Sequence, residues 1–509
     1  MTVSVFPPEA RLFDVATIRE IEARALAVQT GLTLMQKAGL ATAEIAIRLC
    51  NRQDSHVLVL AGPGNNGGDA YEAACLLAER GYHVCIINCG KAEHYSTDAL
   101  SALRKAQNLG LSFITVDDLL SGLTQQWGVI IDGLFGIGLK RPPEGSIARL
   151  IAYINRLSVK SAIPVLAIDV PSGLNADSGQ PVSPEKLAIE ASHTVTFIAD
   201  KPGLHTGAGK DFAGQVLPEL LGIPLDLYPP CQMHLNQQSS LPGHLLRRKH
   251  DSHKGSFGDV SVLGGATGMA GAAILAARAA QLAGVGRIYC GMLAQGPGYD
   301  SLHPELMFRK ADDLELGIAA VVIGPGLGQS KSAHDLLNKA IHRAKTLVID
   351  ADALNLLAMD RDLQTRLSER SDASVLTPHP LEAARLLKLS VSDVQGNRLS
   401  ATRELASRFK ATVILKGSGS VICDPAGQLL INDSGNPALA SGGTGDVLAG
   451  VIAALLAQSC NGLDAARLAT WAHGHAADQL LIKGIGPLGL TASELLPEIR
   501  TILNQLARH

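Results

Sequence analysis

The sequence predicts an α/β protein with two domains. Short apolar runs alternate with helix-spaced stretches along most of the 509 residues, as they do in parallel sheets covered by helices. Most of these runs end in Gly, Asp or His-Pro, and ligand groups in open α/β sheets gather at such strand ends. The alternation lapses once near the middle, and a chain of this length is too long for one ordinary core.

The composition describes a well-buried globular protein. Hydrophobic residues make up 46% of the chain and charged residues only 18%, which excludes a disordered protein. The net charge of −3 argues against a nucleic-acid partner. The one dense basic cluster, Arg247-Arg-Lys-His250, fits the solvated start of an element better than a nucleic-acid patch.

The cysteines and the apolar runs indicate the cellular compartment in which the protein is expected. Eight cysteines are scattered without any Cys-x-x-Cys pair, a pattern that indicates reduced thiols and no zinc site built from cysteine. The N-terminus has no basic segment followed by an apolar core, so no signal peptide is expected. The longest apolar run, residues 447–457, is shorter than the roughly 18 residues of a membrane span. We therefore expect a soluble cytoplasmic protein with no membrane partner.

The first half begins with helix-spaced apolar positions at 17–28 and 33–49. The run 56–61 predicts a buried strand, which passes through a glycine loop into a helix that ends near residue 80. Further strands are predicted at 82–88, 128–132, 164–169 and 193–198. Together these elements predict a parallel sheet covered on both faces.

Residues 221–242 are rich in proline and polar residues, and their apolar residues show neither the helix period nor the strand period. This lapse predicts a first domain at 1–225, a linker at 226–241 and a second domain at 242–509. In the second domain a helix is predicted at 270–282, and strands are predicted at 259–263, 287–290, 319–323, 346–350, 374–377 and 412–415.

The first glycine loop, Gly62-x-Gly64-x-x-Gly67, matches the dinucleotide fingerprint and lies between a strand and a helix. A dehydrogenase would place an acid at the end of the next strand, which here reads Asn88-Cys89-Gly90. The missing acid argues against a nicotinamide dehydrogenase. Asn65, Asn66 and Asp69 instead supply oxygen atoms beside an anion-binding loop.

Two later strands of this half also end in oxygen ligands. Asp132 ends one strand, and Asp169 with Ser172 follows another. Each Asp alone would suit a strand-end turn. Three such loops in one domain favour a ligand site, and oxygen donors suit a hard monovalent or divalent cation rather than zinc.

These motifs resemble the NAD(P)HX epimerase domain, also called the YjeF N-terminal domain, over roughly residues 10–225. The resemblance rests on Ala61-Gly-Pro-Gly-Asn-Asn-Gly-Gly-Asp69, the Asp132 loop and Asp169-Val-Pro-Ser-Gly173, and it implies a Rossmann-like three-layer sandwich. Ala70 departs from the family, which usually has Gly there. The added methyl group could crowd the loop, although the N-terminus of a helix usually tolerates Ala.

The resemblance also implies the roles of individual residues. A potassium ion would be held by Asn66, Asp132 and Ser172, and Asp169 would lie beside the substrate as the acid/base that inverts the hydroxyl-bearing carbon. The hydrated nucleotide would contact Asn65, Asn66, Gly67, Gly68, Asp69, Gly136, Ile137, Gly138, Leu139, Lys140, Arg141 and Pro142.

The second half centres on Ser441-Gly-Gly-Thr-Gly-Asp446, which opens the apolar helix 447–457. Gly442, Gly443 and Gly445 leave their backbone amides uncovered, so these amides can converge on an oxyanion at the positive end of the helix. A carboxylate at Asp446 would then accept a proton from a hydroxyl beside a bound phosphate. The alternative is a glycine-rich turn in which Asp446 only caps a core helix.

The other loops of this half add candidate ligands. Asp350 and Asp352 follow one strand, and Thr377-Pro-His-Pro380 fixes an imidazole between two prolines. Lys416-Gly-Ser-Gly-Ser420 suits nucleotide phosphates, although it is not a Walker A loop. His379 is a substrate contact or a structural histidine, and its residue type does not decide between them.

The strand-Lys-Gly-Ser-Gly pattern followed by Gly-Gly-Thr-Gly-Asp resembles the ribokinase-like superfamily. With His253-Lys-Gly and Gly324-Pro-Gly-Leu-Gly328, the set is similar to the ADP- or ATP-dependent NAD(P)HX dehydratase, the YjeF C-terminal domain, over roughly residues 240–505. The resemblance implies a ribokinase-like three-layer sandwich. It implies substrate contacts at Ala272, Gly328, His379 and Asp446, and adenine-nucleotide contacts at Lys416, Gly417, Ser418, Gly419, Ser420 and Gly445.

We therefore expect a bifunctional repair enzyme for hydrated nicotinamide cofactors. The first domain would interconvert R- and S-NAD(P)HX, and the second would dehydrate the S epimer with ADP or ATP, aided by Mg2+. The partners expected are small molecules, NADHX or NADPHX and ADP or ATP, and the chain is expected to form a homo-oligomer.

Two other functions remain open on the residues alone. The second half would also suit a kinase that phosphorylates a small alcohol, such as a vitamin precursor, and stops there. The first half would also suit a non-catalytic scaffold, because related domains occur in mRNA-decapping proteins. The coupled first domain disfavours the kinase, and the retained Asn66, Asp132, Asp169 and Ser172 disfavour the scaffold.

Overall fold

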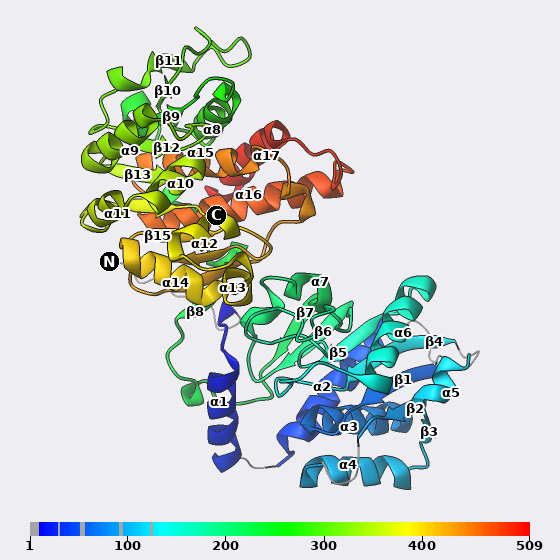
Figure 1. Ribbon diagram of the computed structural model, residues 1–509. Helices are drawn as coiled ribbons and strands as arrows, with labels where there is room; N and C mark the ends of the chain where they lie inside the picture. Colours follow the sequence, from blue (N-terminus) through cyan, green and yellow to red (C-terminus); the bar gives the residue numbers. More distant parts are fainter. Residues whose placement is uncertain (1–9, 29–30, 51–55, 91–94, 123–125, 509) are drawn as a thin grey trace. The chain divides into compact units, whose positions relative to one another are not determined.

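The computed structural model describes residues 10–28, 31–50, 56–90, 95–122 and 126–508. The chain divides into two compact units (Figure 1). The N-terminal unit comprises Arg11–Cys231, and the C-terminal unit comprises Ala10 and the described residues from Gln232 onwards. Each unit is built on its own sheet.

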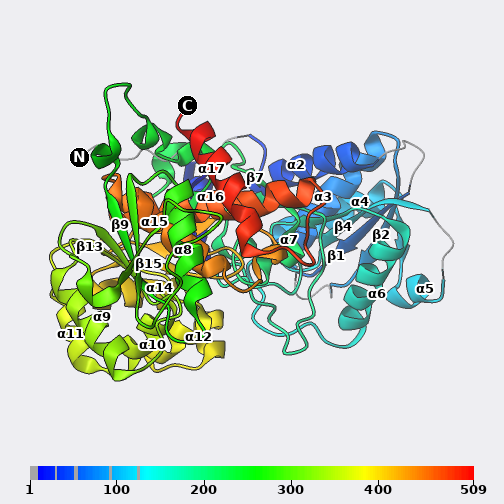
Figure 2. The ribbon, with the colours of Figure 1, turned by 90° about the horizontal axis from the view of Figure 1, so that it is seen from above.

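The N-terminal unit is a three-layer sandwich around a seven-stranded parallel sheet with the strand order β3-β2-β1-β4-β5-β6-β7. Neighbouring residues of one strand face opposite layers. In β1, Val57 and Val59 pack in the core with α2 and α3, whereas Leu58 and Leu60 pack in the core with α6. Figure 2 shows α2 and α3 on one side of these strands and α6 on the other.

The strands of this unit are β1 (His56–Ala61), β2 (His83–Asn88), β3 (Ser112–Ile114), β4 (Trp127–Gly133), β5 (Val165–Ile168), β6 (His193–Phe197) and β7 (Gln215–Glu219). The helices are α1 (Val15–Val28), α2 (Leu34–Leu49), α3 (Asn65–Glu79), α4 (Thr97–Asn108), α5 (Val116–Leu120), α6 (Gly145–Ser161) and α7 (Gly209–Ala213). The predicted strands are confirmed to within one residue at each end, whereas β3 and β7 were not predicted.

The C-terminal unit is also a three-layer sandwich, around a ten-stranded sheet with the order β11-β10-β9-β12-β13-β14-β15-β16-β17-β8. The seven strands from β11 to β15 in this order are parallel to one another. Strand β16 runs antiparallel to both of its neighbours. Helices α8, α15, α16 and α17 contribute the buried residues of the largest core on one face. Helices α9 and α11 lie on the other face (Figure 2).

The strands of this unit are β8 (Met233–Asn236), β9 (Asp259–Gly264), β10 (Arg287–Met292), β11 (Met307–Lys310), β12 (Ala320–Ile323), β13 (Thr346–Ile349), β14 (Ser374–Leu376), β15 (Thr412–Leu415), β16 (Val421–Cys423) and β17 (Leu429–Asn432). The helices are α8 (Ala270–Leu282), α9 (Lys331–Arg343), α10 (Ala351–Met359), α11 (Arg361–Ser368), α12 (Pro380–Leu387), α13 (Val391–Gly396), α14 (Arg398–Phe409), α15 (Thr444–Ala457), α16 (Gly462–Ile482) and α17 (Ala492–Leu506).

The predicted linker at 226–241 includes the boundary between the two units, after Cys231, and it also includes strand β8. This strand pairs in parallel with β17, and all four of its residues are buried. Its polar residues, His234 and Asn236, interrupt the apolar run that would have predicted a strand. The Asn236 side chain donates hydrogen bonds to Asn432 Oδ1 at 2.9 Å and to the Arg467 carbonyl at 3.0 Å, so it is buried with polar partners.

In both sheets the strand order reverses at one point, between β1 and β4 in the first and between β9 and β12 in the second. At such a reversal the loops that follow the two strands diverge to opposite faces and leave a crevice at the carboxyl ends. In the first sheet, the loops 62–67 and 134–138 follow β1 and β4, so the topology places the first predicted site at this reversal. In the second sheet, the loop 324–328 follows β12 at the reversal, whereas the loop 416–420 follows β15 and the loop 441–446 follows β17.

Candidate active sites

A cavity of about 780 Å³ lies at the carboxyl edge of the N-terminal sheet. The predicted residues that line it are Asn65, Asn66, Asp69, Gly136, Ile137, Gly138, Leu139, Lys140, Arg141 and Asp169. Helix α1 forms part of the wall through Ile18, Arg19, Glu22 and Leu26, which were not predicted. The cavity is the size of a typical small-molecule site.

Close backbone packing explains several glycines of the first loop. A Cβ at position 62 would lie 1.8 Å from the Leu134 carbonyl oxygen, and one at position 67 would lie 2.0 Å from the Gly62 carbonyl oxygen. Gly67 therefore lets α3 start directly against the end of β1. Gly67, Gly68 and Pro142 are not among the described residues that line the cavity, so their role as substrate contacts stays a prediction.

The methyl group of Ala70 fits without crowding the loop. Ala70 is fully buried, and its Cβ would lie 2.6 Å from a Cβ at position 133. Because residue 133 is glycine, that volume is free. The loop therefore accommodates the departure from the family pattern.

Asp169 follows β5 with a left-handed backbone, φ 67°, which is uncommon for a residue with a side chain. Its Oδ1 lies 2.7 Å from Lys201 Nζ. Lys201 is fully buried, and its ammonium group also donates to Thr196 Oγ1 at 2.7 Å and to the Phe197 carbonyl at 3.1 Å. Lys201 was not predicted, and its only signal in the sequence is a charge placed soon after a buried strand.

Asp132 in β4 and Ser172, which follows β5, lie together. Ser172 donates its hydroxyl to Asp132 Oδ1 at 2.7 Å and its amide to Oδ2 at 2.8 Å. Burial raises the pKa of Asp132 to about 6, although the hydrogen bonds from Ser172 and from the Leu134 amide oppose the shift. Asp132 is thus a buried carboxyl that ionises close to neutral pH.

Gly136 lets two of the predicted side chains approach one another. A Cβ at position 136 would lie 3.2 Å from both Asn66 Oδ1 and Asp169 Oδ2. Asn66 is buried, and its Nδ2 has no hydrogen-bond partner among the described residues. An orphaned amide at a cavity wall suits a ligand that completes its hydrogen bonds.

Carboxyl groups gather around this cavity. Burial raises the pKa of Asp69 well above its usual range, and the negative charges of Asp169 and Glu22 add to the shift. Burial and the charge of Asp169 also raise the pKa of Glu22. Asp169 differs from both because its carboxylate has the Lys201 ammonium as a direct partner.

In the C-terminal unit, Asp446 lies in the first turn of α15, as predicted. The helix begins at Thr444, with Gly443 in a left-handed conformation at φ 90°. A Cβ at position 443 would lie 2.8 Å from Leu275 Cδ1, whereas one at position 442 would meet nothing within 4 Å. The glycine loop therefore has one position that requires glycine and one that is open.

Lys416 and Asp350 form an ion pair beside this loop, with 2.6 Å between Nζ and Oδ1. Burial lowers the pKa of Lys416, but Asp350 and Glu382 raise it by more, so the ammonium form is favoured. A Cβ at position 445 would lie 3.4 Å from Lys416 Nζ and 3.7 Å from Asp350 Oδ2. Strand ends β13 and β15 thus bring a cation and a carboxylate to the start of α15.

The pKa of Asp446 is raised to about 7 by burial and by the nearby negative charge of Asp350, while Lys416 opposes the shift. A carboxyl that ionises near neutral pH is suited to accept a proton in catalysis. The N-cap residue of α15 is Gly443, and Asp446 lies inside the first turn of the helix.

Arg398 supports the Lys416–Ser420 loop from beneath. It is buried, and it donates to the Leu415 carbonyl at 3.1 Å and the Lys416 carbonyl at 3.3 Å. Gly417 has a left-handed backbone, φ 139°, and a Cβ there would lie 3.0 Å from Arg398 Nη1. Arg398 was not predicted, because it lies on α14, remote in sequence from the loop that it supports.

His379 has a structural role whatever else it does. It is the N-cap of α12, where its Nδ1 accepts from the amides of Leu381 at 3.1 Å and Glu382 at 3.3 Å. Its ring is about half exposed, and burial and the charge of Lys416 lower its pKa. Its neutral imidazole therefore faces the same cluster as Lys416 and Asp350.

The remaining predicted substrate contacts lie on adjoining loops. The Gly328 amide donates to Asp352 Oδ2 at 2.8 Å. A Cβ at position 326 would lie 3.3 Å from the Cβ of Ala272, so the loop after β12 touches the start of α8. The structure therefore brings the predicted residues of this half to one edge of the sheet.

Helix α16 holds the glycine loop from behind, and this contact was not predicted. His473 is buried, and its Nε2 donates to the Thr444 carbonyl at 2.9 Å. Burial lowers the pKa of His473 to about 4, so the ring is neutral. Asp478 accepts from the Gly435 amide at 2.8 Å and from Asn436 Nδ2 at 2.9 Å. Both ends of the segment that precedes Asp446 are thereby fixed.

Two further properties concern the described residues as a set. Among them, no three His, Cys, Asp or Glu side chains lie close enough together to hold a metal ion. None of the helices in the described ranges has both the length and the apolar character needed to cross a bilayer.

Comparisons with known proteins match both units. Residues 31–203 match the family model described as the YjeF-related protein N-terminus, and residues 260–500 match the model described as NAD(P)H-hydrate dehydratase. The bifunctional NAD(P)H-hydrate repair enzyme of Coxiella burnetii is 36% identical over 97% of this chain and 99% of its own length. The enzyme of the same description from Escherichia coli K12 is 37% identical over 93% of this chain and 90% of its own length.

A solved structure also matches. The ADP/ATP-dependent NAD(P)H-hydrate dehydratase of Bacillus subtilis, co-crystallised with ATP and Mg2+, is 28% identical. The match covers 53% of this chain and 98% of that chain, with a TM-score of 0.46.

Proposed function

Because this chain belongs to the family of bifunctional NAD(P)H-hydrate repair enzymes, we propose that it returns hydrated nicotinamide nucleotides to NADH and NADPH with one reaction in each unit. The N-terminal unit interconverts the R and S epimers of NADHX and NADPHX. The C-terminal unit dehydrates the S epimer at the expense of ADP or ATP. The observation that carries this division is that the two family matches cover separate units of the chain, each with its own site.

In the C-terminal unit, Asp446 is the proposed base. It takes the proton of the substrate hydroxyl as that oxygen attacks the terminal phosphate of the nucleotide. The glycine amides at the start of α15 and the ammonium of Lys416 face the phosphate charge. The phosphate ester is a good leaving group, and its elimination with a proton from the neighbouring carbon restores the double bond.

The nucleotide would bind along the Lys416–Ser420 loop and Gly445. Mg2+ would offset charge on the phosphates. Asp350, Asp352 and Asp446 offer oxygen atoms nearby, yet the described residues form no dedicated metal cluster. The donor set therefore fits a magnesium ion carried mainly by the nucleotide phosphates.

The test is recovery of NADH absorbance when the purified protein receives NADHX with ADP or with ATP. Asp446→Asn should lose this recovery and still bind nucleotide in calorimetry. Asp464→Asn is the matched control, because Asp464 is also a first-turn acid, on the following helix α16. Full turnover in Asp446→Asn would remove this residue from the mechanism, and a stable phosphorylated product would identify a small-molecule kinase instead.

In the N-terminal unit, the proposed cation is potassium, held by Asn66, Asp132 and Ser172. Asp132 is fully buried, and its partners in the described part of the chain are a hydroxyl and backbone amides, none of them a cation. Asn66 adds its Oδ1, an oxygen atom that would lie 3.2 Å from a Cβ at position 136, in the loop after β4. A monovalent ion would supply the missing charge and orient the loops.

Replacing K+ by tetramethylammonium should slow R-to-S exchange, and Asp132→Asn should remove the dependence on K+. Equal rates in both salts would contradict the potassium site. If residues at this cavity only form a scaffold, the wild-type protein will not accelerate exchange at all. A homo-oligomeric state and a cytoplasmic location stay predictions.

A further inference from the structure

Helix α1 (Val15–Val28) forms a wall of the epimerase cavity although it precedes the family match, which begins at residue 31. Ile18, Glu22 and Leu26 are spaced by four residues, so they lie along one stripe of the helix. All three line the cavity. A glutamate between two apolar residues on a cavity-facing stripe is unusual, because a carboxylate there loses hydration.

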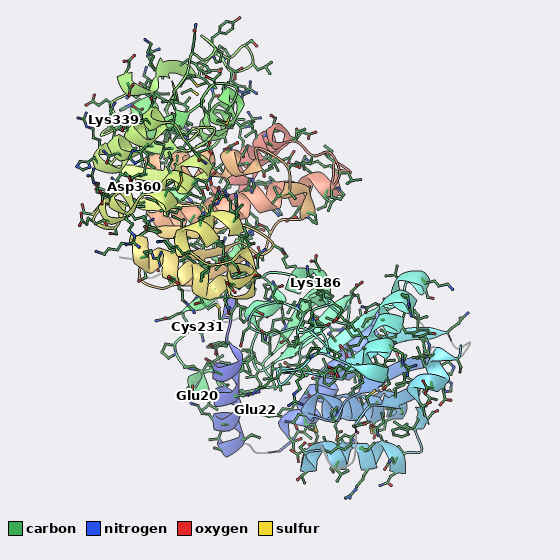
Figure 3. The ribbon with its side chains drawn as sticks, viewed as in Figure 1. Glu20, Glu22, Lys186, Cys231, Lys339 and Asp360 are labelled. Atoms are coloured by element: carbon green, nitrogen blue, oxygen red, sulfur yellow. The ribbon has the colours of Figure 1, made fainter. Side chains whose placement is uncertain are left out.

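Glu22 differs from its neighbour Glu20 on the same helix. Figure 3 shows Glu22 on the side of α1 that faces the unit and Glu20 on the outer side. Glu20 is more than half exposed and pairs with Arg24, one turn away. Glu22 is half-buried, and within the described ranges its carboxyl has no hydrogen-bond or ion-pair partner. Its oxygen atoms are therefore available to a ligand in the cavity.

Several contacts hold α1 in place against the unit. The Val15 amide donates to Asp177 Oδ1 at 2.9 Å, which ties down the start of the helix. Arg24 Nη1 donates to the Leu227 carbonyl at 3.0 Å, which ties down its middle. Apolar burial of Ile18 and Ile21 adds to these contacts. The position of Glu22 is thus set by the fold rather than by a loop.

The charged groups that face Glu22 come from three other parts of the unit and from α1 itself. They are Asp169 after β5, Lys201 after β6 and Asp69 on α3. Arg19 lies about one helical turn before Glu22 on α1. Asp169 is ion-paired with Lys201, and Glu22 is not paired. The two carboxyl groups therefore lie in different electrostatic environments on different walls of one cavity, which suits two carboxyl groups with different roles in proton transfer.

We propose that Glu22 is a second catalytic residue of the epimerisation, acting as the proton donor that complements Asp169. This proposal rests on the epimerase function proposed above. An epimerase must treat both faces of one carbon, so it needs a proton donor and a proton acceptor that reach the substrate from different walls. Asp169 reaches the cavity from the sheet edge, and Glu22 reaches it from α1.

The step balances without any oxidant or reductant. Glu22 gives its proton to the hydroxyl of the hydrated carbon, the C–O bond breaks, and water leaves as the ring nitrogen forms a C=N bond. Water then adds to the other face of that carbon, and Asp169 accepts the proton that this water loses. The two carboxyl groups return to their first protonation states by exchanging a proton with solvent.

The experiment measures R-to-S exchange of NADHX by the full-length chain. Glu22→Gln should lower kcat about 100-fold with a smaller change in KM, as expected for loss of a general acid. The rate in the wild type should fall as pH rises through the pKa of Glu22, and Glu22→Gln should lose that fall. Glu22→Asp should be faster than Glu22→Gln, because it restores an acid at the same place.

Glu20→Gln is the control, since it changes the same residue type on the outer side of the same helix, and its rate should equal the wild-type rate. Dehydration of S-NADHX in each preparation reports whether the rest of the chain is intact. A Glu22→Gln variant with wild-type kcat and pH profile would overturn the proposal. Absence of exchange in the wild type would instead overturn the epimerase function, so the two failures are distinguishable.

Discussion

Asp169 and Asp446 both lie at the carboxyl edge of a sheet, but their partners differ. Asp169 has a buried ammonium as a direct partner. Asp446 has a carboxylate, Asp350, as its strongest charged neighbour, and the ammonium of Lys416 pairs with Asp350 at 2.6 Å. The first arrangement gives the carboxylate a direct cationic partner, and the second keeps a carboxyl group close to its point of ionisation.

The dehydration rate should therefore depend on pH through Asp446. Burial and Asp350 raise its pKa to about 7, and a base acts in its deprotonated form. Below that pH the value of kcat/KM should fall by roughly tenfold per pH unit. Asp352→Asn removes one of the charges that raise this pKa, so it should move the profile to lower pH. A profile that is flat across neutral pH would contradict the assignment.

Lys201→Met should destabilise the N-terminal unit. The variant leaves Asp169 without its partner at a site that is mostly buried, and loss of one member of a buried pair costs about 3 kcal/mol. Urea unfolding followed by tryptophan fluorescence measures the change, because Trp127 is buried in this unit. Lys186→Met is the control, since Lys186 is exposed (Figure 3), and it should unfold like the wild type.

Among the elements, α15 and the glycine loop before it are held by contacts from a neighbouring helix. His473 and Asp478 on α16 hold both ends of the segment from Gly435 to Thr444, so the loop is supported by a neighbouring helix rather than by its own sequence. Glycine is required only where the backbone turns left-handed or another side chain approaches closely.

Gly443→Ala should therefore be costly, and Gly442→Ala should be mild. At position 443 an alanine would have φ 90° and would lie 2.8 Å from Leu275 Cδ1, which together cost about 2 kcal/mol or more. At position 442 nothing lies within 4 Å of the added Cβ. Denaturant unfolding of both variants compares their free energies, and equal losses would show that the strain is not localised at residue 443.

The sequence predicts these elements unevenly, for physical reasons. Buried parallel strands such as β1 are continuous apolar runs and are found to within a residue. Strand β3 has two exposed residues, and β8 carries His234 and Asn236, so neither shows such a run. Strand-end ligands such as Asp132 are visible because they follow an apolar run directly.

Partners from remote elements are not visible in that way. No local sequence pattern predicts Lys201, Arg398 or His473, because each contacts a loop that is distant in the sequence or belongs to another element. Glu22 has a faint signal, a charge within the cavity-facing stripe of α1, but only the cavity shows that the stripe faces a ligand. Packing, rather than pattern, decides these roles.

At the scale of the whole molecule, two complete sites belong to two units that have separate sheets and cores. Each unit contains every residue proposed for its own reaction.

A mixture of two inactive variants should consequently repair R-NADHX. Asp169→Asn should still dehydrate the S epimer, and Asp446→Asn should still exchange the epimers, so S-NADHX released by one variant feeds the other. Each variant alone is the control, assayed at early times to limit spontaneous exchange. If the mixture recovers NADH no faster than Asp169→Asn alone, then substrate must pass between the two sites of one chain.

The placement of β8 has a practical consequence for any attempt to produce the dehydratase half alone. A polypeptide that starts at residue 242 would lack this outermost strand, and the backbone groups of β17 that pair with Met233–Asn236 would be left bare. Uncovered strand edges recruit other chains, so such a fragment would tend to precipitate. A fragment that starts before residue 232 retains β8 paired with β17 and should remain soluble at high concentration.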